Sequence, residues 1–256
     1  MDLSPIAGFI DAPLLVLADA VALAASSMTA EELDPMLATR VELACDFADG
    51  LLADCEESGE VELLERDEIA AIHLYTQHAT FYEHLNFLLR LQDRYSLETF
   101  APYLKLLLGA LYKLPRVKAT VYRGIKENVS ASHMTGTKSV WWTVSSVTLS
   151  VDSLSSNQYF GHSGQRTLFS IAAQHAIDIS RYSSVPSESE LILVPGTRLR
   201  VVACLPAEFC IVQCEEIGSP LGFLELSLQA KTIDFFKFAP AAPVSALVLN
   251  EGIFIS

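Results

Sequence analysis

The chain has 256 residues, an apolar fraction of 51% and a charged fraction of 19%, which are typical of a globular protein and exclude a disordered one. Its formal net charge is −14, and 17 of its 31 acidic residues lie among the first 70, where Arg40 and Arg66 are the only bases. No run of Lys and Arg supplies the clustered positive charge that binds phosphate backbones, so nucleic acid is not expected as a partner.

The cysteines and the N-terminal segment bear on the compartment in which the protein works. The chain has five cysteines with no paired framework, which favours a reducing compartment: Cys45, Cys55, Cys204, Cys210 and Cys214. The first residues lack a basic segment, and Asp11 and Asp19 interrupt their apolar run, so neither a secretory signal nor a membrane span is predicted. A cytoplasmic protein is therefore expected, and secretion as an effector without a cleavable signal stays open.

Helical periodicity dominates the first half of the chain. Apolar residues recur at helical spacing and predict five helices, over about 13–25, 35–55, 64–77, 81–93 and 96–114. Asp34 before Pro35 is predicted as the N-cap of the second helix, and Gly59 as the break that follows it. Thr80 is predicted to cap the fourth helix, and Pro115 to end the fifth.

After Pro115 the pattern changes to short β-rich runs separated by turn residues. These runs predict strands near 120–123, 140–146, 167–173, 190–194, 198–205 and 209–215. Helices first and strands second predict an α+β fold, with the helices packed on one side of the β structure. Because no repeat or low-complexity linker appears, we predict one domain over residues 1–256.

This predicted domain has three parts, which differ in composition. They are a helical part (1–115), a β-rich core (116–217) and an apolar C-terminal extension (218–256). The extension is expected to pack on the body or on a second subunit, or to be exposed to a partner.

Two carboxylates stand one residue apart at the start of an apolar run. In an extended chain Glu188 and Glu190 project to the same side. Like charges so close cost free energy unless a cation or an electron-poor substrate lies between them, and paired carboxylates that act on an oxocarbenium-like centre are arranged in this way. Considered alone, the pair could equally be two glutamates without a function at the solvent-exposed start of a strand.

Two earlier segments carry complementary chemistry. Arg123 stands at a strand end, where its planar guanidinium suits a phosphate, and Gly124 lets a ligand approach the backbone closely. In the segment 141–148 an aromatic strand leads into hydroxyls, and Ser146 and Thr148 share a face. Taken singly, a surface ion pair explains the arginine and turn formation explains the serines.

Spacing does not support a metal site or a glycine-rich nucleotide loop. On a helix His73 and His84 nearly eclipse one another while His78 lies away from both, and Cys210 and Cys214 lack a second ligand pair. Neither a phosphate loop nor a dinucleotide fingerprint of the glycine type is present. We therefore expect no metal.

In their order along the chain, these segments resemble the mono-ADP-ribosyltransferases of the arginine–serine–glutamate class, which include cholera-toxin-like toxins and arginine-specific vertebrate ecto-enzymes. Arg123 matches the arginine of the family's first strand, and Ser146 the first serine of its serine–x–serine element. Glu188 and Glu190 match its Glu-x-Glu motif. Further matching segments are 71–76, 113–115, 164–169 and 182–183, and the resemblance covers about residues 11–217. The serine element departs from the family because it reads Ser-Val-Thr, where Ser-Thr-Ser is common.

The resemblance implies a two-sheet β core and transfer of ADP-ribose from NAD, as co-substrate, to a protein side chain with release of nicotinamide. It implies that Glu190 stabilises the positive charge that develops on the anomeric carbon. Arg123 would hold the pyrophosphate or the adjoining ribose, and Ser146 would orient Glu190 or the nicotinamide ribose. Glu188 would meet the acceptor, and a glutamate at this position resembles the arginine-specific members.

Two more residues take a role from the resemblance. Gly124 would present backbone groups to the nicotinamide amide. Phe160 would either stack on the nicotinamide or belong to the core.

Alternatives to arginine transfer stay open. The same fold could modify a hydroxyl side chain or act on water as an NAD glycohydrolase, which Glu188 disfavours. The chain could also be a catalytically silent binding module, but the grouping of Arg123, Ser146 and Glu190 is costly for a purely structural protein. The target protein and the oligomeric state are not predicted.

Overall fold

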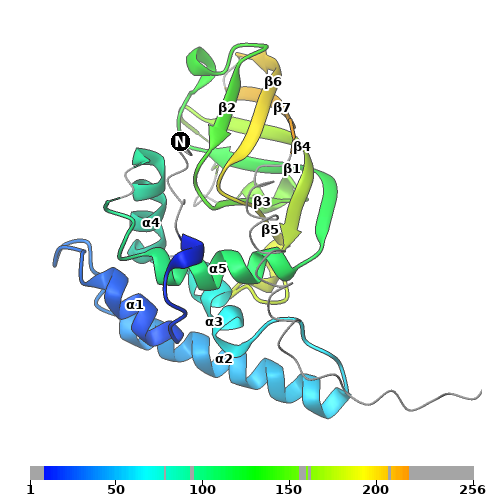
Figure 1. The fold of residues 1–256 in the computed structure, drawn as a ribbon. Coiled ribbons are helices and arrows are strands. Elements are labelled where there is room, and N and C mark those ends of the chain that lie inside the picture. The colour runs from blue at the N-terminus through cyan, green and yellow to red at the C-terminus, as the bar shows by residue number, and fades with distance from the viewer. Residues whose placement is uncertain are drawn as a thin grey trace, which may run out of the picture. The chain divides into compact units, whose positions relative to one another are not determined.

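The structure is a computed structural model, and it describes residues 9–218 except 78, 93–94, 156–159, 161–162 and 207–208. Over this part of the chain, a helical half precedes a β-rich half, which confirms the predicted mixed α and β class (Figure 1). The predicted packing of the C-terminal extension concerns residues outside this described part, apart from Gly218 itself.

All five predicted helices are present. They are α1 (Leu17–Ala25), α2 (Leu37–Ser58), α3 (Arg66–Tyr75), α4 (Thr80–Leu91) and α5 (Ala101–Lys113), preceded by the short 3-10 helix η1 (Phe9–Asp11). Gly59 ends α2 in the left-handed conformation, with φ of 73°, as a glycine after a helix commonly does. Along α5 nearly every side is apolar and buried, and in Figure 1 this helix runs between the sheet and α2.

Two of the predicted helix caps differ from the structure. Asp34 Oδ1 accepts the backbone N–H of Met36 at 2.8 Å and Oδ2 accepts Arg40 Nε at 2.7 Å, so this carboxylate closes the turn before α2 while Met36 is the residue at the cap. Thr80 is the first residue of α4, and its neighbour Ala79 occupies the cap position without a side-chain hydrogen bond. The prediction for Thr80 is wrong because an extended Ala79 already directs the chain into the helix.

In the residues that the structure describes after α5, the chain forms seven strands and three short 3-10 helices. The strands are β1 (Arg116–Ile125), β2 (Lys138–Trp141), β3 (Ser145–Thr148), β4 (Thr167–Asp178), β5 (Glu190–Leu193), β6 (Thr197–Leu205) and β7 (Cys210–Glu216), and the 3-10 helices are η2 (Ser130–Ser132), η3 (Asp152–Ser155) and η4 (Pro186–Glu188). The single strand predicted over 140–146 is wrong. The chain leaves β2, which pairs with β6, and enters β3, which pairs with β5.

The strand pairing also corrects the expected two-sheet core. All seven strands belong to one hydrogen-bonded sheet in the order β1-β3-β5-β4-β7-β6-β2, and an additional pairing of β1 with β4 closes the first four strands on themselves. The long strand β4 is the physical reason. Its first half pairs with β7, and its last residues, Ile177 and Asp178, pair with β5, so one strand joins what would otherwise be separate sheets.

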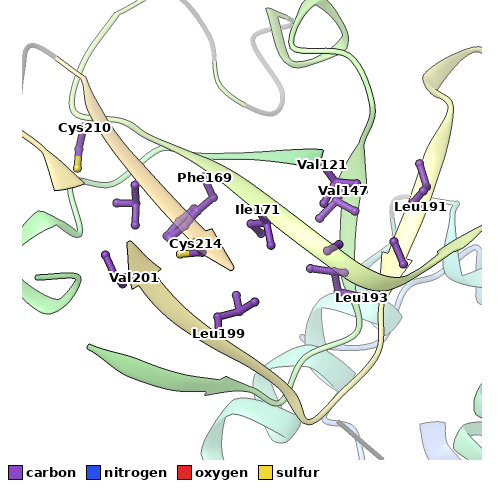
Figure 2. Close-up of a cluster of buried hydrophobic side chains, with 13 residues drawn as sticks. Val121, Val147, Phe169, Ile171, Leu191, Leu193, Leu199, Val201, Cys210 and Cys214 are labelled. Atoms are coloured by element: carbon purple, nitrogen blue, oxygen red, sulfur yellow. The ribbon is translucent and has the colours of Figure 1, made fainter. Parts of the chain in front are cut away.

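One face of the β structure carries the apolar core (Figure 2). Side chains from β1 and β3 to β7 form it, among them Val121, Val147, Phe169, Ile171, Leu191, Leu193, Leu199, Val201, Cys210 and Cys214. Val147 and Leu191 point into this core. Because side chains alternate along a strand, their neighbours Ser146, Thr148 and Glu190 lie on the opposite face of β3 and β5.

Candidate active site

The pairing of β3 with β5 brings Ser146 and Glu190 to the same face. Thr148 lies directly opposite Glu190, and Ser146 lies opposite Ile192, two residues further along β5. Ser146 and Glu190 are therefore diagonal neighbours across the strand pair. The Glu190 carboxyl group is nearly buried, with 9% of the residue exposed, and it accepts a hydrogen bond from the Ser183 hydroxyl at Oε2 over 3.3 Å.

Arg123 reaches the same place from β1. Its Nη1 donates to the backbone carbonyl oxygen of Ser146 at 2.7 Å. Burial disfavours the charged guanidinium and lowers the pKa of Arg123, and the positive charge of Arg90 adds to this effect while Glu190 opposes it. The structure thus brings together Arg123, Ser146 and Glu190, which the sequence analysis singled out from three separate segments.

Helices α3 and α4 form the wall of this site through residues that the sequence analysis did not single out. Tyr75 at the end of α3 donates its hydroxyl to the Val144 carbonyl oxygen at 2.8 Å, and it accepts a hydrogen bond from Asn86 Nδ2 at 3.2 Å. Asn86 Oδ1 in turn accepts the N–H of Val144 at 3.0 Å. These bonds tie both helices to the residue that precedes β3.

Tyr75 and Tyr82 both lie within electrostatic reach of Arg123 and Glu190. Burial raises the pKa of Tyr75 to about 12, and the charges of Glu190 and Arg123 act on it in opposite directions. On α4, Tyr82 also responds to the charges of Arg123 and Glu190, and burial raises its pKa. Tyr82, Asn86 and Arg90 follow one another at four-residue intervals, so this polar stripe along α4 was the signal that could have identified the wall.

Gly124 and Phe160 contact each other next to Arg123. A Cβ on Gly124 would lie 2.9 Å from both Cβ and Cδ2 of Phe160, a distance that only the absence of a side chain permits. Phe160 also packs edge-on to Phe209, with ring centroids 5.7 Å apart, and the guanidinium carbon of Arg166 lies 5.0 Å and 5.5 Å from the two rings. Gly124 therefore lies against Phe160, and Phe209 and Arg166 pack on that ring; of these three residues only Phe160 was expected from the sequence.

The backbone at Glu188 differs from the extended geometry that was predicted. Glu188 ends the 3-10 helix η4, Ser189 takes the left-handed conformation with φ of 47°, and β5 begins only at Glu190. The strand alternation that would place both carboxylates on one side does not apply, because the two residues before Glu190 are not extended. The prediction of a shared strand face is therefore wrong, and the role of Glu188 has to be argued separately.

The residues that the structure describes contain neither a metal-binding group of side chains nor a membrane-spanning helix. Among them, no three or more His, Cys, Asp or Glu side chains form a group that could hold a metal ion. No helix in the same residues combines the length and the apolar composition needed to cross a membrane.

Comparison with known proteins shows which family of proteins this chain belongs to. The family model described as NAD:arginine ADP-ribosyltransferase matches residues 55–208, more than half of the chain. The chain belongs to this family, and it is an enzyme that uses NAD as co-substrate to transfer ADP-ribose to protein. No curated protein matches the chain by sequence.

Solved structures of two ADP-ribosyltransferases and of a bacterial effector share the fold. The eucaryotic mono-ADP-ribosyltransferase ART2.2 superposes with a TM-score of 0.56 at 18% identity, over 79% of this chain and 86% of that one. The ADP-ribosyltransferase Vis from Vibrio splendidus, crystallised with agmatine, gives a TM-score of 0.53 at 20% identity, over 83% and 91%. The type III effector XopAI from Xanthomonas axonopodis pv. citri gives 0.52 at 13% identity, over 73% and 89%.

Proposed function

We propose that this enzyme modifies arginine side chains of a protein acceptor and that Arg123, Ser146 and Glu190 form its catalytic centre. The observation that carries the proposal is the convergence of these residues from β1, β3 and β5, with Arg123 bonded to the Ser146 carbonyl oxygen 2.7 Å away. A half-buried cation and a nearly buried carboxylate at one site suit a co-substrate that carries a pyrophosphate and develops positive charge on a ribose carbon.

Glu190 is the residue assigned to the reacting carbon. Cleavage of the bond between nicotinamide and ribose builds positive charge on the anomeric carbon, and a fixed carboxylate stabilises that charge in the transition state. Glu190 would accept a hydrogen bond from the ribose 2′-hydroxyl. Ser146, its diagonal neighbour across the strand pair, would orient this carboxylate or the nicotinamide ribose.

Arg123 and the residues beside it are assigned to the rest of NAD. The guanidinium would hold the pyrophosphate or the adjoining ribose, because a planar cation can form two parallel hydrogen bonds to phosphate oxygens. Gly124 would present its backbone to the nicotinamide amide. Phe160, which lies against Gly124 and remains partly exposed, would stack on the nicotinamide.

Glu188 is assigned to the acceptor. It stands two residues before Glu190, just outside the strand, and a carboxylate matches a guanidinium in charge and in its two-pronged geometry. The description of the family supports an arginine acceptor, and so does the agmatine bound to Vis, since agmatine carries a guanidinium group. The fold shared with the effector XopAI supports delivery of this protein into another cell.

To test the proposal, the wild type or Glu190→Gln is incubated with labelled NAD and a mixed lysate. The modified side chains are then mapped by mass spectrometry. We expect label on arginines that the variant abolishes. Label on serine or threonine would instead assign a hydroxyl acceptor, and nicotinamide release without protein label would assign a glycohydrolase. No turnover of NAD would indicate a silent binding module and contradict the proposal.

A further inference from the structure

The loop between β4 and β5 brings the chain to Glu190, and its first turn is fixed by its own backbone. The N–H groups of Tyr182 and Ser183 both donate to the Ile179 carbonyl oxygen, at 2.8 Å and 3.0 Å, and the N–H of Ile179 donates to the Glu190 carbonyl oxygen at 3.1 Å. The loop thus starts and ends at the same point of the sheet. The contacts made by the residues inside the loop therefore bear on the position of the Glu190 side chain.

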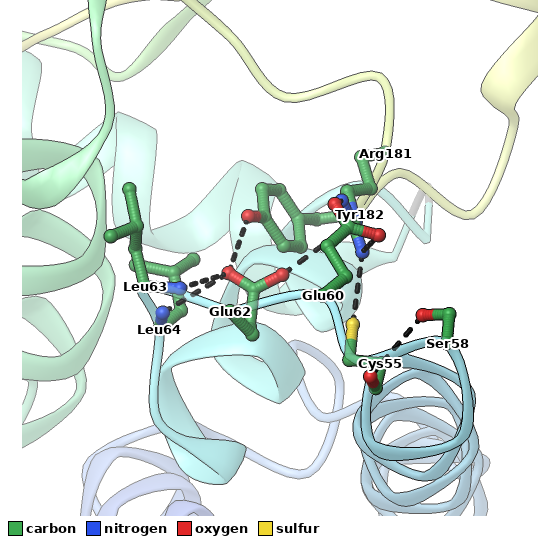
Figure 3. Close-up of polar contacts among 8 residues, drawn as sticks. All are labelled: Cys55, Ser58, Glu60, Glu62, Leu63, Leu64, Arg181 and Tyr182. Carbon is green, nitrogen blue, oxygen red and sulfur yellow. Dashed lines mark hydrogen bonds and ion pairs between the residues drawn. The ribbon is translucent and has the colours of Figure 1, made fainter.

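The connection between α2 and α3 binds this loop from one side (Figure 3). The Tyr182 hydroxyl donates to Glu62 Oε1 at 2.8 Å, and the same oxygen accepts the N–H groups of Leu63 and Leu64 at 2.8 Å and 3.1 Å. Only 6% of the Glu62 side chain is exposed, and Arg181 Nε lies 3.6 Å from its other oxygen. A buried carboxylate with this many donors is a rigid anchor.

The end of α3 binds the loop from the other side. His73 Nδ1 lies 3.1 Å from the Tyr182 carbonyl oxygen, so both polar ends of Tyr182 are held by the helical half. Thr76 forms two bonds with Ser184, because its Oγ1 accepts the Ser184 N–H and its carbonyl oxygen accepts the Ser184 hydroxyl, each at 2.8 Å. The residues before and after Ser183 are therefore both fixed to α3.

Ser183 lies between these two anchored residues and faces Glu190. It is 1% exposed, its Oγ accepts the N–H of Val185 at 3.1 Å, and its hydroxyl donates to Glu190 Oε2 at 3.3 Å. The bond to Glu190 Oε2 is the one that the described contacts of Ser183 give its hydroxyl proton, and it favours one orientation of the carboxylate.

From this geometry we infer that Ser183 is a positioning residue for Glu190, and that α3 and the α2–α3 connection set the carboxylate's orientation through Tyr182 and Ser184. The inference rests on the proposed function, in which Glu190 acts on the ribose. A carboxylate that is misplaced by about 1 Å can lower the rate of an enzyme roughly 100-fold while the substrate still binds.

The test compares NAD hydrolysis, followed as nicotinamide release without an acceptor, in wild type, Ser183→Ala and Ser183→Thr. Ser187→Ala is the matched control, because Ser187 belongs to the same loop but is exposed. We expect kcat of Ser183→Ala to fall about 10- to 100-fold with KM for NAD within about twofold, since orientation and not binding is lost. Ser183→Thr keeps a hydroxyl and should retain most of the activity, and the control should match the wild type.

The pH profile separates positioning from a general loss of structure. A carboxylate that loses a hydrogen-bond donor holds its proton more tightly, so the acid limb of kcat should move to higher pH in Ser183→Ala. The titratable groups that act electrostatically on Glu190 from the neighbouring elements, Arg123, Tyr75 and Tyr82, are the same in every variant. Tyr182→Phe, which removes only the bond to Glu62, should give a smaller fall in kcat and a shift in the same direction.

Each outcome of this test bears on one claim. If the wild type is active and Ser183→Ala keeps its kcat and its pH profile, the positioning role is overturned and the proposed function stands. If Ser183→Ala fails to fold, Tyr182→Phe serves instead, and an unchanged kcat and pH profile in that variant overturns the positioning role. A wild type that neither releases nicotinamide nor modifies protein contradicts the proposed function, and this inference with it.

Discussion

Phe160 lies against the backbone of Gly124 so closely that a Cβ added to the glycine would be 2.9 Å from the Cβ and the Cδ2 of the phenylalanine. Gly124 has an ordinary negative φ, so space and not backbone strain requires the glycine. This contact places an aromatic ring next to the strand residue that follows Arg123.

Replacement of this glycine should therefore displace the ring. We predict that Gly124→Ala raises KM for NAD about tenfold or more, because the methyl group forces Phe160 away from its position over the backbone. Steady-state kinetics of nicotinamide release measure this. Gly50→Ala is the control, since nothing lies within 4 Å of the added Cβ, and it should leave KM unchanged. An unchanged KM in Gly124→Ala would show that the contact does not shape the NAD site.

Glu188→Gln tests the assigned acceptor role without altering the size of the side chain. Loss of the charge should weaken attraction to an arginine guanidinium, whereas NAD hydrolysis uses water and does not need that attraction. We predict that transfer to arginine falls at least tenfold more than hydrolysis does. Both rates can be measured in one reaction, by counting labelled protein and free ADP-ribose. Equal loss of the two activities would remove Glu188 from acceptor recognition.

His73 should make the stability of the fold depend on pH. Its ring stacks on Phe47 with centroids 4.0 Å apart, and burial lowers the pKa of His73 although the Tyr182 carbonyl oxygen partly opposes this. The unfolded chain therefore takes up a proton at higher pH than the folded one. The contribution is complete above the unfolded value of about 6.5 and is lost as the pH falls below it.

Urea unfolding of the wild type and of His73→Gln between pH 5 and 8 measures this contribution. We predict that the midpoint of the wild type falls more steeply below about pH 6.5 than that of the variant, because glutamine does not titrate. Parallel curves for the two proteins would show that His73 has the same proton affinity in the folded and unfolded states.

The helices were predictable from sequence because their apolar residues recur at helical spacing. In α2 this spacing can be read without knowing which elements the helix packs against. Arg123, Ser146 and Glu190 could be singled out because each stands in a recognisable segment, and the structure brings the three together. The remainder depends on contacts between distant segments. Asn86 lies in a polar stripe of α4 that the sequence shows, but its partner, the N–H of Val144 between β2 and β3, cannot be read from the sequence.

The prediction that Glu188 is part of an extended strand was wrong for a related reason. Alternation in an extended chain is a sound rule, but it presupposes that the strand has already begun. Here a left-handed Ser189 separates η4 from β5. A serine in the sequence does not by itself predict a positive φ.

The most direct measurement of the central claim uses purified protein, NAD and agmatine as a small guanidine acceptor, with wild type beside Glu190→Gln. We predict ADP-ribosylated agmatine and free nicotinamide from the wild type. We predict neither product from the variant, whose near-isosteric side chain should leave the circular dichroism spectrum and the thermal midpoint close to those of the wild type. A folded Glu190→Gln that forms the product at the wild-type rate would contradict the assignment of Glu190 as the catalytic carboxylate.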